Sequence, residues 1–223
     1  TSKSFILLII SLYFIYNVKI YVILSFLPAG LLFIFNQFIV NIKSSFIRKS
    51  IRPLVLIGSF ALAFNYISSL QEDFFIQETI QTIEQTQDWH TKVSEEGRGY
   101  TLGKYDASAF GILQKLPLAI NVTLFRPYIW EAQGALLLIA SLENLFILLF
   151  SIKVLFVVRP ISIIKYISSN STLILAFVFT FILAFIVGFT TYNFGALARY
   201  KIPLIPYYLA GLLILQQLHR DKK

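Results

Sequence analysis

Apolar residues occur in long runs separated by short polar connections, without the period-two alternation of a barrel strand. Several runs approach or exceed the roughly 20 residues that a helix needs to cross a bilayer core. Six such segments are present: Ser4–Val18, Ile20–Val40, Pro53–Leu70, Gly134–Val158, Thr172–Thr191 and Ile202–Leu218. Because backbone polar groups in lipid must be satisfied within their own segment, each run predicts a helix. We therefore expect an all-α, polytopic transmembrane helical bundle of about six spans.

Composition supports a membrane protein and removes several other classes. Hydrophobic residues make up 57% of the chain and charged residues 13%, against roughly 25% charged in a soluble domain. The net charge is +8, but no basic face with interleaved aromatic residues lies outside the apolar segments, so no nucleic acid is expected. Cysteine is absent, which excludes disulfides and thiolate chemistry. His90 and His219 lack a second ligand at metal spacing, so neither a metal nor a cofactor is expected.

The distribution of Lys and Arg predicts the orientation. If the chain crosses six times, one side carries the short basic connections and the tail: Lys43, Arg48, Lys49, Arg52, Arg159, Lys165, Arg220, Lys222 and Lys223. The short connections of the other side carry only Lys19, Arg199 and Lys201. Positively charged loops remain in the cytoplasm. We therefore expect a protein of the bacterial inner membrane with both termini cytoplasmic.

The long segment 71–133 is then extracytoplasmic, between three spans in residues 1–70 and three in residues 134–223 with their basic tail. It begins with a surface helix, Gln71–Val93, whose apolar side chains recur at helical spacing. Those that would dock a partner are Ile76, Ile80, Ile83 and Trp89. Its second half, 110–133, is apolar but is interrupted by charges and prolines, which predicts a re-entrant or interfacial element.

Three cations, Arg126, Arg199 and Lys201, fall on this outer side, each beside prolines and aromatic residues. One interpretation is a basic pocket for an anionic headgroup, because the arginine fork bonds phosphate oxygens in pairs. The other interpretation is that these side chains anchor helix ends to lipid phosphates.

Two polar residues, Glu143 and Asn144, lie inside the fourth segment. An ionisable group at that depth is expensive and indicates a partner. Glu143 either pairs with Arg126 or Arg199 across the bundle or forms a structural polar clamp between helices. Asn193, near the outer end of the fifth segment, is expected to be a packing residue.

The stretches "LFRPYIWEAQGALLLIASLENLFILL" and "NFGALARYKIPLIPYYLAGLLIL" resemble the C-terminal part of bacterial multi-pass membrane proteins of cell-surface polysaccharide assembly. These are oligosaccharide repeat-unit polymerases and related lipid-linked sugar transferases. The resemblance implies an extracytoplasmic site that holds a polyprenyl-diphosphate-linked glycan. Carried over residue by residue, the site contains Arg126, Glu131, Glu143, Asn193, Arg199 and Lys201. Such polymerases have more spans than the six predicted here.

Two hypotheses follow. In the first, the chain is an enzyme or part of one, and Arg126, Arg199 and Lys201 bind the diphosphate without a nucleophilic side chain. In the second, it is a non-catalytic subunit that docks other envelope membrane proteins and binds membrane lipids. A small-solute transporter is disfavoured, because no pair of Gly- or Pro-broken spans recurs in two matching halves.

Overall fold

The structure is a computed structural model that describes residues 19–39, 99–106, 108–191 and 193–222, with isolated positions between 44 and 92. This described part is all-α, as the sequence predicts, with eight α-helices and one 3-10 helix. They are α2 (Ile20–Ile39), α5 (Ala109–Gln114), α6 (Leu116–Phe125), η1 (Ile129–Glu131), α7 (Ala135–Val158), α8 (Pro160–Ser169), α9 (Ser171–Thr190), α10 (Phe194–Tyr200) and α11 (Leu204–Arg220).

Three of these helices, α2, α7 and α9, are long and apolar enough to cross a membrane. A fourth span is present if the bent pair α10 and α11 counts as one. The predicted sixth segment, Ile202–Leu218, is not a span by itself, because α11 has only 17 residues and reaches the required length together with α10. The described part therefore contains three to four candidate spans, and it covers four of the six segments predicted for the whole chain.

The other predicted spans, Ser4–Val18 and Pro53–Leu70, lie outside the described residues apart from isolated positions. The same holds for the predicted surface helix Gln71–Val93, of which only Lys92 is described. Its four predicted docking residues are therefore also outside: Ile76, Ile80, Ile83 and Trp89.

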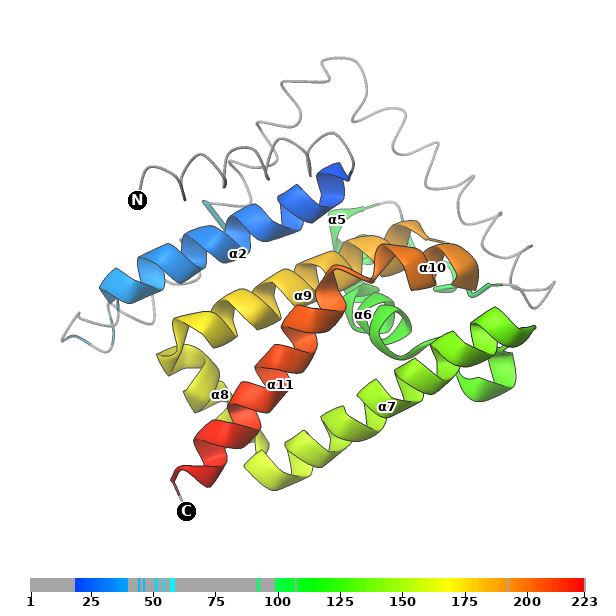
Figure 1. Cartoon of the computed structure of the whole chain (residues 1–223). Helices are drawn as coiled ribbons and strands as arrows, with labels where there is room; N and C mark the ends of the chain where they lie inside the picture. Colours follow the sequence, from blue (N-terminus) through cyan, green and yellow to red (C-terminus); the bar gives the residue numbers. More distant parts are fainter. Residues whose placement is uncertain are drawn as a thin grey trace, which may run out of the picture.

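Helix α9 is the centre of the bundle, and α2, α6 and α11 pack against it (Figure 1). In the most apolar stretch of α9, 56% of the residues are buried, compared with 22% in α7. The buried side chains of α9 include Leu173, Phe179 and Leu183, which form the middle of the core. Helix α7 contacts α6 and α11 along one face and leaves most of its apolar side chains exposed.

Small residues bring α6 and α9 into close contact. Ala119 and Thr123 on α6 face Ala184 and Gly188 on α9, so each helix presents two small residues four positions apart. The Thr123 hydroxyl donates a hydrogen bond to the Ala184 carbonyl at 2.7 Å. A Cβ on Gly188 would lie 2.2 Å from the Ala119 carbonyl oxygen, so only glycine fits there.

The predicted interfacial element is built from short helices. Helix α6 has 10 residues, about 15 Å of helix, which is too short to cross a bilayer. Pro117 lies in its first turn, where a missing backbone N–H costs no helical hydrogen bond. The chain then turns through Arg126 and Pro127 into η1 and reaches α7 after Gly134.

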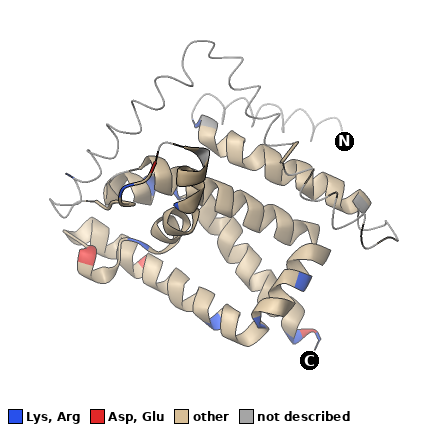
Figure 2. Ribbon diagram, turned by 180° about the vertical axis from the view of Figure 1, so that it is seen from behind, with Lys and Arg blue, Asp and Glu red and all other residues tan. Residues whose placement is uncertain are grey.

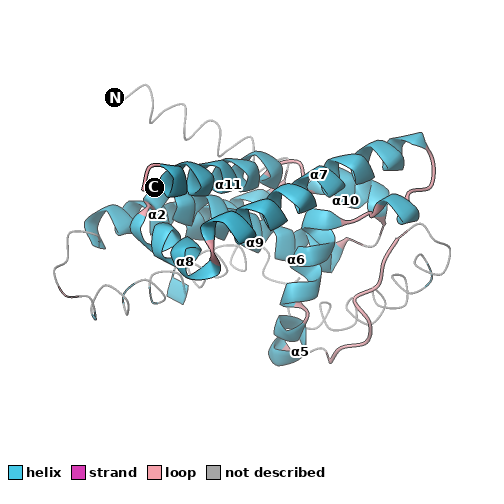
Figure 3. Cartoon of the chain, turned by 90° about the horizontal axis from the view of Figure 1, so that it is seen from below, coloured by secondary structure: helices cyan, strands magenta, loops and turns pink. Residues whose placement is uncertain are grey.

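Helix α8 forms a sharp connection between α7 and α9 (Figure 3). Arg159, between α7 and α8, has a φ of 63°, a conformation uncommon outside glycine, and Pro160 begins α8. Asn170 then caps α9 by accepting hydrogen bonds from two backbone amides of the first turn. Nearby, the Asn36 amide donates to the Ser171 hydroxyl at 2.8 Å and ties the C-terminal end of α2 to the start of α9.

The last two helices meet at an angle of 63°. Asn193 caps α10 by accepting a hydrogen bond from the Ala196 amide, and the chain turns at residues 201–203. The bend precedes Pro206 and is therefore not caused by it. Pro206 lies in the first turn of α11, where its missing N–H has no helical partner to lose.

Candidate functional site

The bundle has two ends with different charge patterns (Figure 2). We call one the Arg126 end: it contains the C-terminal end of α6, η1, the start of α7, α10 and the start of α2. We call the other the α8 end: it contains α8, the end of α7, the start of α9 and the end of α11. The cations predicted to bind an anionic headgroup all belong to the Arg126 end.

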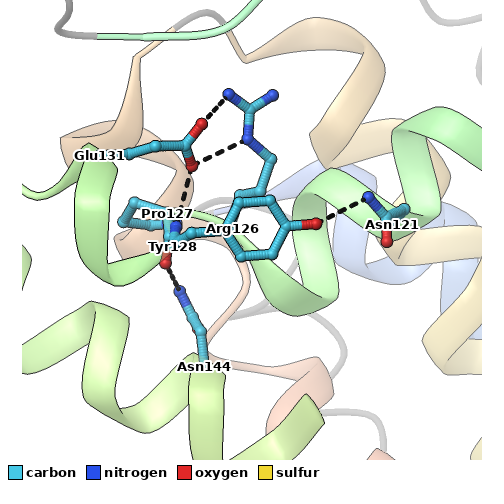
Figure 4. A network of polar contacts seen from close by, with 6 residues as sticks. All are labelled: Asn121, Arg126, Pro127, Tyr128, Glu131 and Asn144. Atoms are coloured by element: carbon cyan, nitrogen blue, oxygen red, sulfur yellow. Dashed lines mark hydrogen bonds and ion pairs between the residues drawn. The ribbon is translucent and has the colours of Figure 1, made fainter.

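Arg126 follows α6 directly and is held by Glu131, five residues later (Figure 4). Its Nε donates to Glu131 Oε2 at 3.0 Å, and its terminal nitrogen pairs with Glu131 Oε1. Glu131 Oε2 also accepts the backbone amide of Tyr128 at 2.8 Å. The short loop therefore closes on itself, and a two-bonded arginine–carboxylate pair sets the orientation of the guanidinium.

Three aromatic rings surround the same guanidinium. Its central carbon lies 5.3 Å from the ring centre of Phe194, 5.6 Å from Tyr100 and 6.0 Å from Tyr128. Such contacts attract a cation to the negative face of a ring. Because the rings come from α10, the 99–106 segment and the Arg126 loop, the cation joins three separate parts of the chain.

Tyr100 also connects this cluster to the central helix. Its ring is buried and its hydroxyl donates to the Gly188 carbonyl of α9 at 3.0 Å. Burial raises the pKa of the Tyr100 hydroxyl, more than the nearby positive charge of Arg126 lowers it. The hydroxyl therefore remains a protonated donor.

Lys201 is buried at the bend between α10 and α11, with only 2% of its surface exposed. Its ammonium donates to the side-chain oxygen of Asn144 on α7. The Asn144 amide in turn donates to the Pro127 carbonyl at 3.2 Å (Figure 4). A continuous polar connection thus runs from the α10–α11 bend through α7 to the loop that holds Arg126.

Arg199 lies differently from the other two predicted cations. It is exposed, and its Nε donates to the Gly195 carbonyl of its own helix at 3.2 Å. The structure therefore brings Arg126 and Lys201 to one junction through Asn144, and it leaves Arg199 on the surface beside that junction.

Glu143 does not make the ion pair with Arg126 or Arg199 that the sequence suggests. Arg126 pairs with Glu131 instead, because both residues lie on the same loop. Glu143 is exposed on α7. The Glu143 carboxylate interacts with the Lys201 ammonium electrostatically, without a hydrogen bond between them among the described residues. The polar clamp between helices is made by Asn144 instead.

Asn193 occupies a structural position. Besides capping α10, it forms a backbone bridge with Gly99, which holds the 99–106 segment against the end of α9. Nothing in the sequence indicates that this segment brings Tyr100, or that α10 brings Phe194, against Arg126. Aromatic residues are frequent throughout the chain. Their spacing in the sequence therefore does not indicate which rings, from three separate segments, surround Arg126.

A second aromatic cluster lies at the start of α2. The Lys19 ammonium is 4.5 Å from the ring centre of Tyr200 and 5.6 Å from that of Tyr21. The two rings are 5.8 Å apart, so α2 and α10 meet at the same end of the bundle as Arg126. Within the described ranges, no three His, Cys, Asp or Glu side chains are grouped as metal ligands.

The described helices and this polar junction define a multi-pass α-helical membrane protein with three to four candidate spans. Comparison with models of known protein families, with curated proteins and with solved structures finds no match to the chain.

Proposed function

We propose that this chain is an integral membrane protein of bacterial cell-surface glycan assembly that binds a polyprenyl-diphosphate-linked glycan at the Arg126 end. The observation that supports this proposal is the polar junction between separate helices. Lys201 from the α10–α11 bend and the loop of Arg126 meet through Asn144, at one end of a bundle whose long helices are apolar. Arg126 is paired with Glu131, but the exposed Arg199 beside the junction has no carboxylate partner among the described residues, and a lipid diphosphate supplies one.

In this proposal the residues have different roles. Arg199, exposed beside the junction, contacts the diphosphate with a guanidinium whose terminal nitrogens are not bonded to other described residues. The guanidinium of Arg126 is already paired with Glu131 and lies at a fixed position beside the diphosphate. The buried ammonium of Lys201 makes the electrostatic potential near Arg126 and Arg199 more positive. In the enzyme hypothesis, negative charge develops on the diphosphate as the glycan is transferred from it. These groups stabilise that charge without rearranging.

The direct test is lipid binding by the purified protein in detergent, measured by native mass spectrometry. We expect a polyprenyl diphosphate to bind the wild type and to bind Arg199→Gln about tenfold more weakly, which corresponds to about 1.4 kcal/mol. Lys104→Gln, which removes an exposed cation from the 99–106 segment, is the matched control and should bind normally. Equal affinity of Arg199→Gln and the wild type would remove the proposal. In cells, Arg199→Ala at normal protein level should abolish the surface glycan.

A second function is favoured by a separate observation on α7. This helix exposes most of its apolar side chains, and among them Glu143 exposes a carboxylate nine residues into the helix. An ionisable group facing lipid is expensive unless a neighbouring helix supplies a donor. The chain would then be a non-catalytic subunit of a larger envelope complex, with α7 against a partner helix that carries Lys or Arg at this depth.

The two functions differ in their response to mutation. For the subunit, Glu143→Leu should abolish co-purification of another membrane protein in fixed stoichiometry, whereas Arg199→Ala should leave surface glycan unchanged. Lys153→Gln, at another exposed position of α7, is the control and should keep the complex intact. A chain that purifies alone from native membranes, both as wild type and as Glu143→Leu, would contradict this second function.

A further inference from the structure

The α8 end presents apolar side chains and cations on one surface. Ile161 is 84% exposed and Ile164 is 69% exposed, and both lie on the outward face of α8 together with the exposed Lys165. The opposite face of α8 is fixed to the bundle by the buried Tyr166. A helix of 10 residues cannot cross a membrane. A short helix with an apolar face and a cation beside it fits the boundary between headgroups and acyl chains.

The charge at this end is unbalanced among the described residues. Arg159, Lys165, Arg220 and Lys222 are exposed there, and the one described carboxylate beside them is Asp221, which accepts a hydrogen bond from Gln217. None of the four cations has an ion-pair partner within the described ranges. This differs from the Arg126 end, where the carboxylates of Glu131 and Glu143 accompany the cations.

The start of α8 also offers backbone N–H donors that have no acceptor among the described residues. Arg159 precedes the helix and makes no side-chain cap, and Pro160 has no N–H, so the free amides of the first turn are those of Ile161 and Ser162. Uncapped amides at a helix start favour an anion, and the guanidinium of Arg159 lies on the residue that leads into them. The tail is held nearby, because the Lys222 ammonium lies 4.5 Å from the ring centre of Tyr166.

These observations concern a different part of the molecule from the Arg126 end and do not depend on the function proposed above. We propose that the α8 end is a binding site for one anionic phospholipid. Arg159, Lys165 and the first turn of α8 hold its phosphate, and an acyl chain lies against Ile161 and Ile164. The occupant is a lipid and not a soluble phosphate, because the cations share their surface with large exposed apolar side chains.

The test is a titration of the full chain in detergent with phosphatidylglycerol or phosphatidylcholine, measured by native mass spectrometry. The variant Arg159→Gln with Lys165→Gln should bind phosphatidylglycerol about 25-fold more weakly, about fivefold for each cation. The control Lys19→Gln with Lys104→Gln removes two cations from the opposite end of the bundle and should bind normally. Unchanged binding by the α8 variant, or an equal loss in both variants, would overturn the site.

Two further arms identify the occupant. Glycerol phosphate without acyl chains should not compete with phosphatidylglycerol; effective competition would mean a soluble phosphate site and would overturn the lipid assignment. Ile164→Gln should weaken binding of long-chain phosphatidylglycerol and leave a six-carbon analogue unaffected. Equal loss for both chain lengths would contradict the proposed acyl contact. Thermal unfolding of each variant checks that it is folded.

Discussion

The ammonium of Lys201 is buried at the α10–α11 bend. Removing a charge from water is expensive unless hydrogen bonds replace the lost hydration. Asn144 is the single hydrogen-bond acceptor that the described residues offer, and its own amide is held by the Pro127 carbonyl. The arrangement stabilises the α10–α11 bend only while both side chains are present.

We therefore predict that Asn144→Leu destabilises the protein strongly, because it leaves the Lys201 ammonium buried without an acceptor. The expected loss is about 2–3 kcal/mol in the free energy of unfolding. The measurement is denaturation in mixed micelles, monitored by tryptophan fluorescence.

The double variant Asn144→Leu with Lys201→Met is the informative comparison. It removes the stranded charge as well, and apolar replacements of a buried polar pair are often nearly neutral. We expect the double variant to be more stable than Asn144→Leu alone. A double variant that is less stable than either single variant would show that the pair is not coupled in this way.

At the scale of the element, close packing of α6 on α9 depends on the absence of a side chain at one position. The Cβ of an alanine at Gly188 would meet the backbone of Ala119 at 2.2 Å and the Thr123 hydroxyl at 2.5 Å. Backbone atoms cannot move aside individually, so the two helices would have to separate. The hydrogen bond from Tyr100 to the Gly188 carbonyl would be displaced with them.

Gly188→Ala should therefore destabilise the protein by about 1–3 kcal/mol, read as a lower midpoint of thermal unfolding in detergent. The matched control is Gly30→Ala on α2, where the new Cβ would lie 3.7 Å from Phe26, an ordinary contact. Alanine is also the better helix former, so Gly30→Ala should leave stability unchanged or raise it slightly. Equal effects of the two substitutions would contradict the packing described for α6 and α9.

The connections show where local sequence rules succeed. Pro160 and Asn170 lie where a proline and a cap are expected, at the starts of α8 and α9. Pro206 does not bend α11, because a proline bends a helix only when it lies beyond the first turn. Its effect depends on where the helix begins, and the bend at 201–203 moves that beginning to Leu204.

At the scale of the molecule, the two ends of the described bundle differ in charge (Figure 2). Arg159 and Lys165, which the sequence predicts on the cytoplasmic side, belong to the α8 end. The segment that contains Lys104 is attached to the opposite end through Tyr100. Which end faces the cytoplasm stays a prediction from the positive-inside rule.

The absence of cysteine makes this orientation directly testable. A single cysteine at Lys104 should react with a membrane-impermeant maleimide added to the outside of intact cells. A single cysteine at Lys222 should react only after the cells are opened. Labelling of both positions from the same side would contradict the predicted topology, and with it the assignment of the Arg126 end to the extracytoplasmic face.

The sequence by itself determined the all-α class, the membrane environment and the approximate bounds of the long helices α2, α7 and α9. These properties depend on how long and how apolar each run of consecutive residues is, and both can be read from the local sequence alone. It also indicated that Arg126 and Lys201 are unusual, since isolated cations beside apolar runs are costly wherever they lie.

Only the tertiary structure decided the partners of these charges. Arg126 takes Glu131 from its own loop, Lys201 takes Asn144 from a helix 57 positions away, and Arg199 remains exposed. Hydrophobic periodicity specifies which face of a helix is buried, but not which other helix covers it or at what height along the axis. The contacts of a buried ammonium or guanidinium depend on distances of a few ångströms between helices, and those are set by packing such as that of Gly188 against Ala119.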